Sequence, residues 1–189
     1  MQFSKSSLRK KAILERKKKY LKVKEFDFKE IFKLIKKNFT GKNIIIAGYY
    51  PSNYEVDIVK FLERAHEKNF KIALPVINSS SKMSFKSWIF KEPLYVSKFG
   101  TLEPKKSNKE VLPDLILVPL VVFDNQLNRL GYGKGYYDRS LSKIKKIKKK
   151  VISIGIAYSF QKFNRIPVNK YDVKLDYVLT ERGIISSHQ

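Results

Sequence analysis

The chain has 189 residues, of which 43% are hydrophobic, enough to build the core of a single domain spanning residues 1–189. It has no cysteine and only two histidines, His66 and His188, which excludes disulfides, thiolate metal sites and cysteine nucleophiles and leaves almost no room for histidine catalysis. The net charge of +23 attracts anions, but only seven of the 40 basic residues are arginine, the residue that base and phosphate recognition favours.

Two further features of the sequence bear on where the protein is located. The longest apolar run, residues 115–123, is far shorter than the roughly 20 residues that cross a bilayer. Residues 1–20 are basic and lack the apolar centre of a secretory signal. We therefore expect a cytoplasmic protein without membrane contact. We also expect a monomer and, because arginine is scarce, no specific nucleic-acid binding.

The first third of the chain predicts helices around a buried strand. Residues 4–20 predict a very basic helix whose few apolar positions are Leu8, Ala12 and Leu14. Residues 26–31 fit a capping box with a hydrophobic staple, which starts a helix that runs to about residue 38 and ends at Gly41. Residues 44–50 form a continuous apolar stretch, typical of a parallel strand covered on both faces.

A β-α-β unit is completed by the next two segments. Residues 52–68 predict a helix, and Ser52 with Glu55 fits a capping box at its start. Residues 70–76 predict the following strand. Between residues 78 and 112, short alternating pieces at 83–85, 88–90 and 94–96 indicate small antiparallel strands.

The second half predicts another β-α-β unit. Residues 114–123 are the strongest buried-strand signal and lead into a loop over 124–135. A helix over 136–147, a strand over 151–157 and a short strand over 177–180 before a frayed end complete the pattern. Alternating strands and helices predict an α/β fold, a three-layer α/β/α domain with a mainly parallel central sheet and ligand sites at the carboxyl ends of its strands.

A glycine-rich loop carries the clearest functional signal. Three of the eight glycines lie within residues 131–135, between the buried strand and a helix, where backbone N–H groups and the helix N-terminus favour an anion. Arg129 and Lys134 add positive charge, and Asp138 follows one helical turn later, where it suits Mg²⁺ or an ordinary helix N-terminus. A flexible connection is the alternative reading of such a loop.

This segment and several others resemble 5-formyltetrahydrofolate cyclo-ligases, also called methenyltetrahydrofolate synthetases. The resemblance spans nearly the whole chain in the same order, and the glycine segment is long enough to be highly specific. Residues 167–172 depart from the family pattern of acidic residues and a histidine before an aspartate, which leaves a second metal ligand, Asp172, open. The matching segments are Lys5-Ser6-Ser7-Leu8-Arg9, Glu55-Val56-Asp57, Leu74-Pro75, Phe99-Gly100-Thr101-Leu102-Glu103-Pro104 and Arg129-Leu130-Gly131-Tyr132-Gly133-Lys134-Gly135-Tyr136-Tyr137-Asp138-Arg139, with Val118-Pro119 and Phe123-Asp124 before the last.

The resemblance implies ATP- and Mg²⁺-dependent closure of 5-formyltetrahydrofolate, possibly polyglutamylated, to 5,10-methenyltetrahydrofolate, with release of ADP and phosphate. It implies Arg129 and Lys134 as catalytic residues and Asp138 and Asp172 as metal ligands. ATP contacts are implied for Lys5, Ser6, Ser7, Leu8, Arg9, Arg129, Leu130, Gly131, Tyr132, Gly133, Lys134, Gly135, Tyr136 and Tyr137, and folate contacts for Tyr50, Glu55, Tyr132, Gly133, Lys134, Gly135 and Tyr136.

Simpler interpretations stay open for these residues. Glu55 could serve only as a helix cap, and Lys5 and Arg9 could belong to a solvated basic face. Tyr49, Tyr50, Tyr136 and Tyr137 could pack the core, and the lysine run 143–150 is expected to be a helix face exposed to water. For the whole protein, the alternatives are a basic nucleic-acid-binding module or a different α/β nucleotide-binding enzyme.

Overall fold

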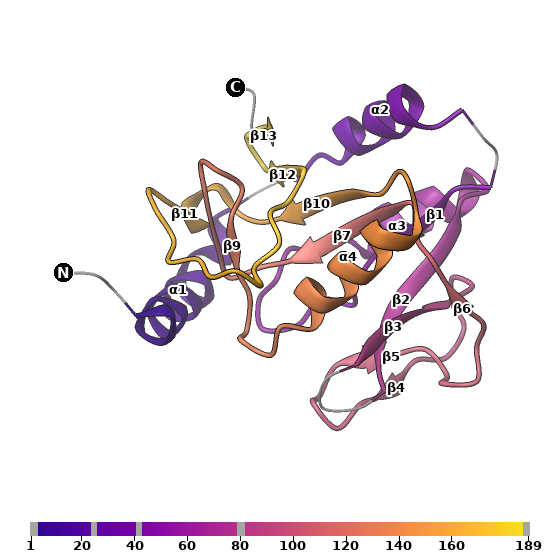
Figure 1. Ribbon diagram of the computed structural model, residues 1–189, viewed down its shortest axis with the longest axis horizontal. Coiled ribbons are helices and arrows are strands. Elements are labelled where there is room, and N and C mark those ends of the chain that lie inside the picture. Colours follow the sequence, from indigo (N-terminus) through magenta and orange to yellow (C-terminus); the bar gives the residue numbers. More distant parts are fainter. Residues whose placement is uncertain (1–3, 24–25, 41–42, 79–81, 187–189) are drawn as a thin grey trace.

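The computed structural model describes residues 4–23, 26–40, 43–78 and 82–186, so the predictions for Gly41 and His188 lie outside it (Figure 1). Most predicted helices and strands are present. In chain order the elements are α1 (Lys5–Lys19), η1 (Tyr20–Lys22), α2 (Lys29–Asn38), β1 (Ile45–Ala47), α3 (Val59–Glu67), β2 (Lys71–Ile77), β3 (Met83–Ser87), β4 (Tyr95–Val96), β5 (Leu102–Glu103), β6 (Glu110–Val111), β7 (Leu115–Pro119), β8 (Val122–Asp124), β9 (Arg129–Leu130), α4 (Tyr136–Ile147), β10 (Ile152–Ile156), η2 (Ser159–Gln161), β11 (Lys162–Phe163), β12 (Tyr177–Thr180) and β13 (Gly183–Ser186).

The described residues form one large sheet with the strand order β13-β12-β10-β7-β1-β2-β3-β6. Neighbours from β12 to β2 pair in parallel, whereas β3, β6 and β13 join at the edges by antiparallel pairing. The predicted mainly parallel sheet and both predicted β-α-β units are therefore confirmed.

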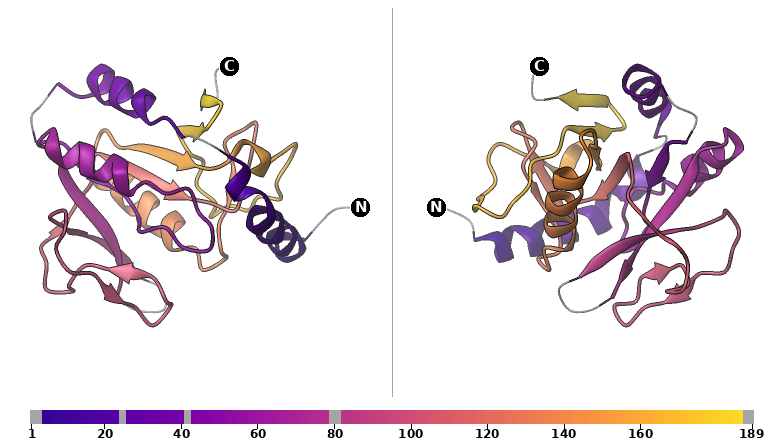
Figure 2. Two further views of the ribbon diagram at one scale, coloured as in Figure 1. Left: turned by 180° about the vertical axis from the view of Figure 1, so that it is seen from behind. Right: turned by 45° about the vertical axis from the view of Figure 1, so that its right-hand side comes forward.

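Helices cover both faces of this sheet, which confirms the predicted three layers (Figure 2). On one face, Ile31 of α2 and Phe61 of α3 pack on Ile46 and Leu117, all of them buried. On the other face, Leu141 of α4 belongs to a second cluster with residues such as Ile116 and Val118. Successive strand residues therefore pack alternately into two separate cores, as expected for a sheet covered on both sides.

The predicted strand over 114–123 is wrong as a single element. It consists of β7 in the large sheet and β8 in a small sheet with the order β11-β8-β9. Between them, the side-chain amide of Gln161 donates to the backbone carbonyls of Leu120 (3.0 Å) and Val121 (2.8 Å), so these carbonyls are satisfied outside the large sheet. The predicted loop over 124–135 also contains β9, which pairs antiparallel with β8.

The helix predicted to begin at residue 52 begins only at Val59. Asn53 and Tyr54 have positive φ angles of 48° and 63°, a left-handed turn that cannot continue as a helix. The carboxylate of Asp57 accepts from the N–H of Val59 at 2.8 Å and satisfies a donor at the true start. Residues 52–58 are therefore a loop, and Glu55 lies in it.

Two further predictions need correction. Residues 88–90 are not a strand, because the chain turns after Trp88, whose indole N–H donates to the carbonyl of Glu92 at 3.1 Å. The expected frayed end contains β13, whose residues pair with β12, for example Ile184 with Leu179. The pairing of β13 with β12 is a tertiary interaction that local sequence patterns do not report.

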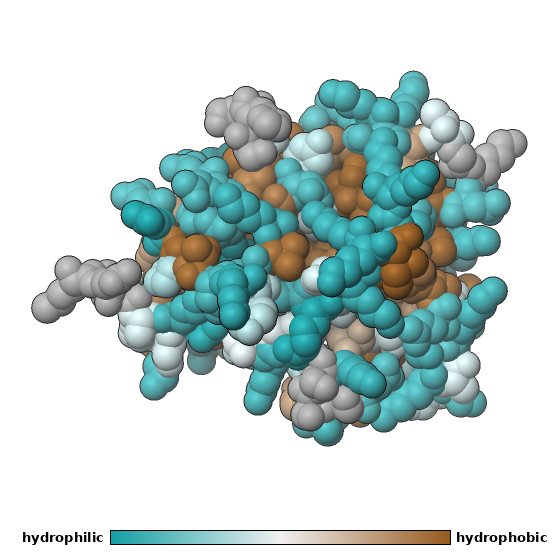
Figure 3. Space-filling view, in the orientation of Figure 1, coloured by the Kyte–Doolittle hydropathy of each residue, from teal (hydrophilic) through white to brown (hydrophobic). Residues whose placement is uncertain are grey.

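The face that carries α4 is predominantly hydrophilic, with apolar side chains gathered in separate patches (Figure 3). Within the described part of the chain, no helix combines the length and the apolar character required to traverse a bilayer.

Candidate functional site

A cleft of about 1060 Å³ opens beside the carboxyl ends of β1, β2 and β7, where the fold predicts ligand binding. Its walls come from α1, the loop after β1, the β4–β5 hairpin, the loop between β9 and α4, and residues 169–173. Of the predicted site residues it is lined by Lys5, Arg9, Tyr50, Glu55, Arg129, Leu130, Gly131, Tyr132, Gly133, Lys134, Gly135, Tyr136, Tyr137, Asp138 and Asp172.

The glycine-rich loop enters α4 through two left-handed residues. Gly133 has a φ of 100° and Gly135, at the N-cap of α4, a φ of 66°, conformations that favour glycine. Among the described residues, none accepts a hydrogen bond from the backbone N–H groups of residues 132–135. These donors and the N-terminus of α4 can therefore bind an anionic ligand in the cleft.

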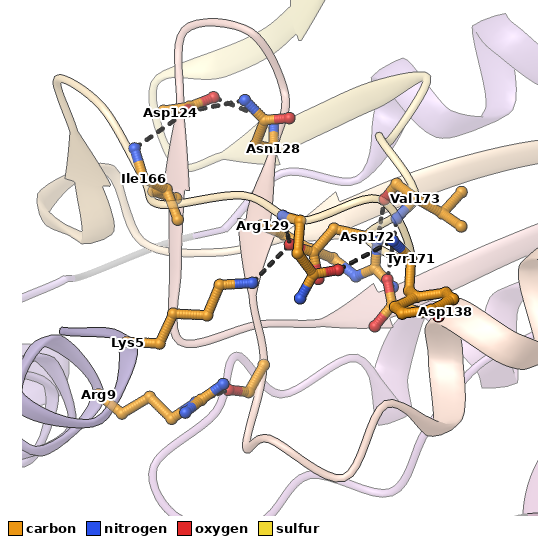
Figure 4. A network of polar contacts seen from close by, with 12 residues as sticks. Lys5, Arg9, Asp124, Asn128, Arg129, Asp138, Ile166, Tyr171, Asp172 and Val173 are labelled. Atoms are coloured by element: carbon orange, nitrogen blue, oxygen red, sulfur yellow. Dashed lines mark hydrogen bonds and ion pairs between the residues drawn. The ribbon is translucent and has the colours of Figure 1, made fainter.

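Arg9 connects α1 to this loop. Its Nε donates to the carbonyl of Gly131 at 2.7 Å, and a Cβ added to Gly133 would lie 3.2 Å from its Cζ. In Figure 4 the Arg9 side chain extends from α1 toward the loop. Lys134 lines the same cleft and makes no ion pair with any residue that the structure describes, so its ammonium group can accept an anionic partner.

A buried carboxylate fixes the hairpin that precedes the loop. Asp124 is 2% exposed and accepts from the backbone N–H groups of Gln126, Asn128 and Ile166 at 3.0, 3.0 and 3.2 Å (Figure 4). Because the Asp124 carboxylate accepts these backbone N–H groups, the β8–β9 turn is held in place, and Arg129, which follows Asn128, lines the cleft.

Arg129 holds Asp138 in place. Its guanidinium donates to Asp138 Oδ1 at 2.8 Å and to the carbonyl of Val173, and Asp138 Oδ1 also accepts from the N–H of Val173 at 3.0 Å. Burial lowers the pKa of the Arg129 guanidinium, and the charge of Asp138 opposes that shift. These contacts make Arg129 a positioning residue for Asp138, whereas its direct contact with ATP stays a prediction.

Lys5 and Asp172 both line the cleft and form an ion pair. Lys5 Nζ lies 2.5 Å from Asp172 Oδ2, which also accepts from the N–H of Asn169 at 2.7 Å (Figure 4). Asn169 in turn accepts from the N–H of Tyr171 at 2.9 Å. The segment that departs from the family pattern is therefore a side-chain-capped turn that keeps Asp172 in the cleft.

The donor set suits a magnesium ion that arrives with a phosphate ligand. Asp138 and Asp172 both line the cleft, and each has one carboxylate oxygen engaged by protein donors. The described residues contain no group of three or more His, Cys, Asp or Glu side chains that would hold a metal alone. Mg²⁺ in nucleotide sites is commonly held by one or two carboxylates together with phosphates and water, which these residues fit.

Glu55 lines the cleft from the loop that follows β1. Its Oε2 accepts from the N–H of Ser52 at 2.9 Å and from the Ser52 hydroxyl at 3.3 Å, and its Oε1 accepts from the Tyr132 hydroxyl at 2.9 Å. Burial raises the pKa of Glu55, while these hydrogen bonds and the charge of Arg16 oppose the shift. Because α3 begins only at Val59, the interpretation of Glu55 as a helix cap alone is wrong.

Three predicted ATP contacts do not reach the cleft. Ser6 and Ser7 are exposed outside its lining, and Ser7 bonds to Ser4 at the start of α1. Leu8 is 3% exposed and packs with Val121 and Leu130. The physical reason is helical periodicity, since Lys5 and Arg9 lie one turn apart on one face and the residues between them point elsewhere.

The tyrosines divide between core and cleft. Tyr49 is 3% exposed and donates to the carbonyl of Val56 at 2.9 Å, so it belongs to the core where the core borders the cleft. Tyr136 lies 6.2 Å from the Phe99 ring, between centroids, at the cleft wall. Tyr137 also lines the cleft, and its buried hydroxyl has no hydrogen-bond partner among the described residues. An incoming ligand would therefore find a free hydroxyl there.

Several residues that shape the cleft were given no role from the sequence. Phe99 and Glu103 line it from the β4–β5 hairpin, and Lys143 and Lys146 line it from α4. Arg16 donates a hydrogen bond to the cleft residue Tyr132, and its spacing of four and eight residues from Ala12 and Leu8 could have indicated that it shares their buried face. The lysine run is also not simply a solvated face, since Lys145 pairs with Asp176, Lys148 with Asp114, and Lys150 with a backbone carbonyl.

Comparisons with known proteins agree on one family. A sequence model of the 5-formyltetrahydrofolate cyclo-ligase family matches residues 1–181. A 5-formyltetrahydrofolate cyclo-ligase from Haemophilus influenzae is 33% identical over 140 residues, covering 71% of this chain and 74% of that protein. The solved 5,10-methenyltetrahydrofolate synthetase of Aquifex aeolicus has a TM-score of 0.75 at 30% identity, covering 98% of this chain and 93% of its own. That of Mycoplasma pneumoniae has a TM-score of 0.70 at 28% identity, covering 95% and 99%.

Proposed function

Because the chain belongs to the 5-formyltetrahydrofolate cyclo-ligase family and is an enzyme of that class, we propose that it uses ATP and Mg²⁺ to close 5-formyltetrahydrofolate to 5,10-methenyltetrahydrofolate. ADP and phosphate are the other products. The observation that carries the proposal is one cleft lined by a glycine-rich loop with unpaired backbone donors, by the carboxylates of Asp138 and Asp172, and by the half-buried acceptor Glu55. Such a cleft suits a nucleotide and a pterin side by side.

The nucleotide half uses backbone donors and cations. The free N–H groups of residues 132–135 and the side chains of Lys5, Arg9 and Lys134 would surround the triphosphate. Lys5 now pairs with Asp172, so a phosphate would compete with that carboxylate for the same ammonium group. Of the catalytic pair predicted from sequence, Lys134 would contact the transferred phosphoryl group and Arg129 would act through Asp138.

The folate half uses Glu55 and aromatic surface. A carboxylate pairs naturally with the donor N–H edge of a pterin, and Glu55 already accepts three hydrogen bonds from Ser52 and Tyr132 that keep it oriented. Tyr50 and Tyr136 line the cleft and offer ring faces on which a flat pterin can stack.

The chemistry requires positioning and charge neutralisation rather than a protein nucleophile. Transfer of the terminal phosphoryl group of ATP to the formyl oxygen breaks the bond to ADP and turns a poor leaving group into phosphate. The neighbouring anilinic nitrogen attacks the formyl carbon, and phosphate and the nitrogen's proton depart as the five-membered ring closes. Lys134 and the loop N–H groups would stabilise the charge that develops on the phosphoryl oxygens.

Asp138 and Asp172 are the residues that would hold Mg²⁺, which when bound neutralises phosphate charge and orients the phosphoryl group. The Arg129 contact keeps Asp138 directed into the cleft, and the capped turn at Asn169 does the same for Asp172.

The proposal is tested by mixing the purified protein with 5-formyltetrahydrofolate, ATP and Mg²⁺ and following the near-ultraviolet absorbance of the methenyl product. We expect product to form only when all three are present, with one ADP released per ring closed. An absence of product in the complete mixture, with folded protein, would refute the assignment.

We expect Arg9→Ala to raise the KM for ATP by roughly tenfold, because a charged hydrogen-bonding group at the loop is lost. The folate KM and the melting temperature should change little. The exposed neighbour Lys10→Ala removes the same charge from the same helix and serves as the matched control. An unchanged ATP KM in Arg9→Ala would remove α1 from the nucleotide site.

The nucleic-acid-binding alternative has less support. Several of its cations are engaged within the protein, including Lys5 with Asp172 and Lys148 with Asp114. Such a module would bind DNA or RNA with a steep salt dependence and without any effect of ATP, which a filter-binding titration at two salt concentrations would reveal.

A further inference from the structure

Arg16 is a basic residue of α1 that is buried beside Leu8 and Ala12. It is only 1% exposed, whereas the adjoining Lys17 and Lys18 are exposed. No carboxylate of the described residues lies within ion-pair distance of its guanidinium, and its Nε has no hydrogen-bond partner there. A buried, charged side chain without a direct counter-ion is costly, so a compensating role is expected for it.

Its two other guanidinium nitrogens have definite targets. Nη1 donates to the carbonyl of Leu120 at 3.0 Å, at the point where the chain leaves β7 for β8. Nη2 donates to the hydroxyl of Tyr132, and the guanidinium carbon lies 5.7 Å from the centre of that ring. The Arg16 side chain therefore links α1 by hydrogen bonds to the end of β7 and to the glycine-rich loop.

The direction of these bonds is set by chemistry. A guanidinium can only donate, so the Tyr132 oxygen must accept from Arg16, and the hydroxyl hydrogen is left to donate to Glu55 Oε1 at 2.9 Å. Glu55 is thereby required to be an acceptor at Oε1, as it already is at Oε2 toward Ser52. The chain of bonds selects the ionised carboxylate.

We propose that Arg16 is a positioning residue for folate, which acts through the hydroxyl of Tyr132 to hold Glu55 as an oriented carboxylate. The inference rests on the proposed function, because it assumes that Glu55 receives the pterin. It assigns a role in substrate recognition to a side chain that lies outside the cleft lining.

The electrostatic surroundings of Glu55 agree with this role. The ionisable groups that face it are Arg16 from α1, Tyr132 from the glycine loop, Tyr49 from the end of β1 and Tyr137 from α4. Burial raises the pKa of Glu55, and Arg16 is the cation that opposes this shift. Removing Arg16 should therefore raise the Glu55 pKa further, so that the carboxylate is protonated at a higher pH.

The test measures the dissociation constant of 5-formyltetrahydrofolate by calorimetry from acidic to mildly alkaline pH in the full chain. We expect Arg16→Met to weaken folate binding about tenfold near neutral pH and to move the acid limb of the profile to higher pH, with ATP binding unchanged. Tyr132→Phe, which leaves Arg16 in place, should move the acid limb in the same direction. At alkaline pH, where Glu55 is ionised in every variant and the direct effect of the Arg16 charge on its pKa no longer matters, the double variant should bind folate no more weakly than Tyr132→Phe alone.

Two further variants separate positioning from folding. Arg16→Lys keeps the charge but cannot reach both acceptors at once, so it should retain the position of the acid limb better than Arg16→Met and is the variant to use if Arg16→Met does not fold. Lys18→Met removes one charge from an exposed position of α1 and should behave like the parent.

A parental folate profile in a folded Arg16 variant, or additive losses in the double variant at alkaline pH, would overturn the inference. Failure of the parent protein itself to bind folate would instead refute the proposed function.

Discussion

Asp138→Asn should raise the Mg²⁺ concentration needed for half-maximal turnover by about tenfold or more, with folate affinity kept within about twofold. Asp138 is a partly buried carboxylate in the cleft beside Lys134 and the N-terminus of α4, where the phosphates of ATP are proposed to lie. Asparagine keeps one oxygen for the N–H of Val173 and the guanidinium of Arg129 but loses the negative charge that favours a cation. Initial rates over a Mg²⁺ titration at saturating ATP measure the effect.

The same substitution also removes the counter-charge of Arg129, whose side chain is 4% exposed. We expect a loss of about 1–3 kcal/mol in the free energy of unfolding, which a denaturant titration would detect. Asp27→Asn is the matched control, since Asp27 also stands at a helix start but lies outside the cleft. A Mg²⁺ dependence identical to that of the parent would exclude Asp138 as a ligand.

Hydrophobic pattern was sufficient to predict the sheet but not its turns. The continuous apolar segments at β1, β7 and β10 predicted buried parallel strands, and α4 begins and ends where the pattern places it. The division of 114–123 could not be predicted in this way, because both halves are equally apolar and the break depends on Gln161, 40 residues later in the chain. The late start of α3 depends likewise on a left-handed turn that the sequence offered as a capping box.

In the candidate site, too, local features were predictable from the sequence and contacts between distant segments were not. Glycines, cations and Asp138 are contiguous in sequence, and their grouping in the cleft follows from one strand–loop–helix connection. Contacts between distant segments could not be predicted from the sequence, for example the pairing of Lys5 with Asp172 across 167 positions. The burial of Arg16 was not predicted, because a charged side chain normally indicates a solvated face. Here hydrogen-bond acceptors after the end of β7 and on Tyr132 make its burial possible.

Glu55→Gln should raise the KM for folate by about 100-fold while the KM for ATP changes little, because a neutral amide cannot replace an ionised acceptor for two N–H donors of a pterin. The effect of this substitution on the free energy of unfolding has two opposed contributions. The folded-state pKa of Glu55 is raised above its value in the unfolded chain, so ionisation of Glu55 opposes folding as pH rises through the interval between the two. Near neutral pH the loss of this charge favours folding, whereas the amide NH2 group would face the N–H of Ser52 or the hydroxyl of Tyr132, so the glutamine variant should stay within about 1 kcal/mol of the parent in a denaturant titration.

The pH dependence of folate affinity tests directly whether Glu55 is the group that titrates. In the parent, folate affinity should fall as acidification protonates Glu55, at a pH above that expected for an exposed glutamate, because burial raises its pKa. In Glu55→Gln that acid limb should disappear, and the profile should be flat where the parent declines. Glu67→Gln, on the exposed end of α3, is the matched control and should keep the parental limb. A glutamine variant that binds folate weakly yet retains the limb would mean that another group titrates, and Glu55 would then be only a structural acceptor for Tyr132 and Ser52.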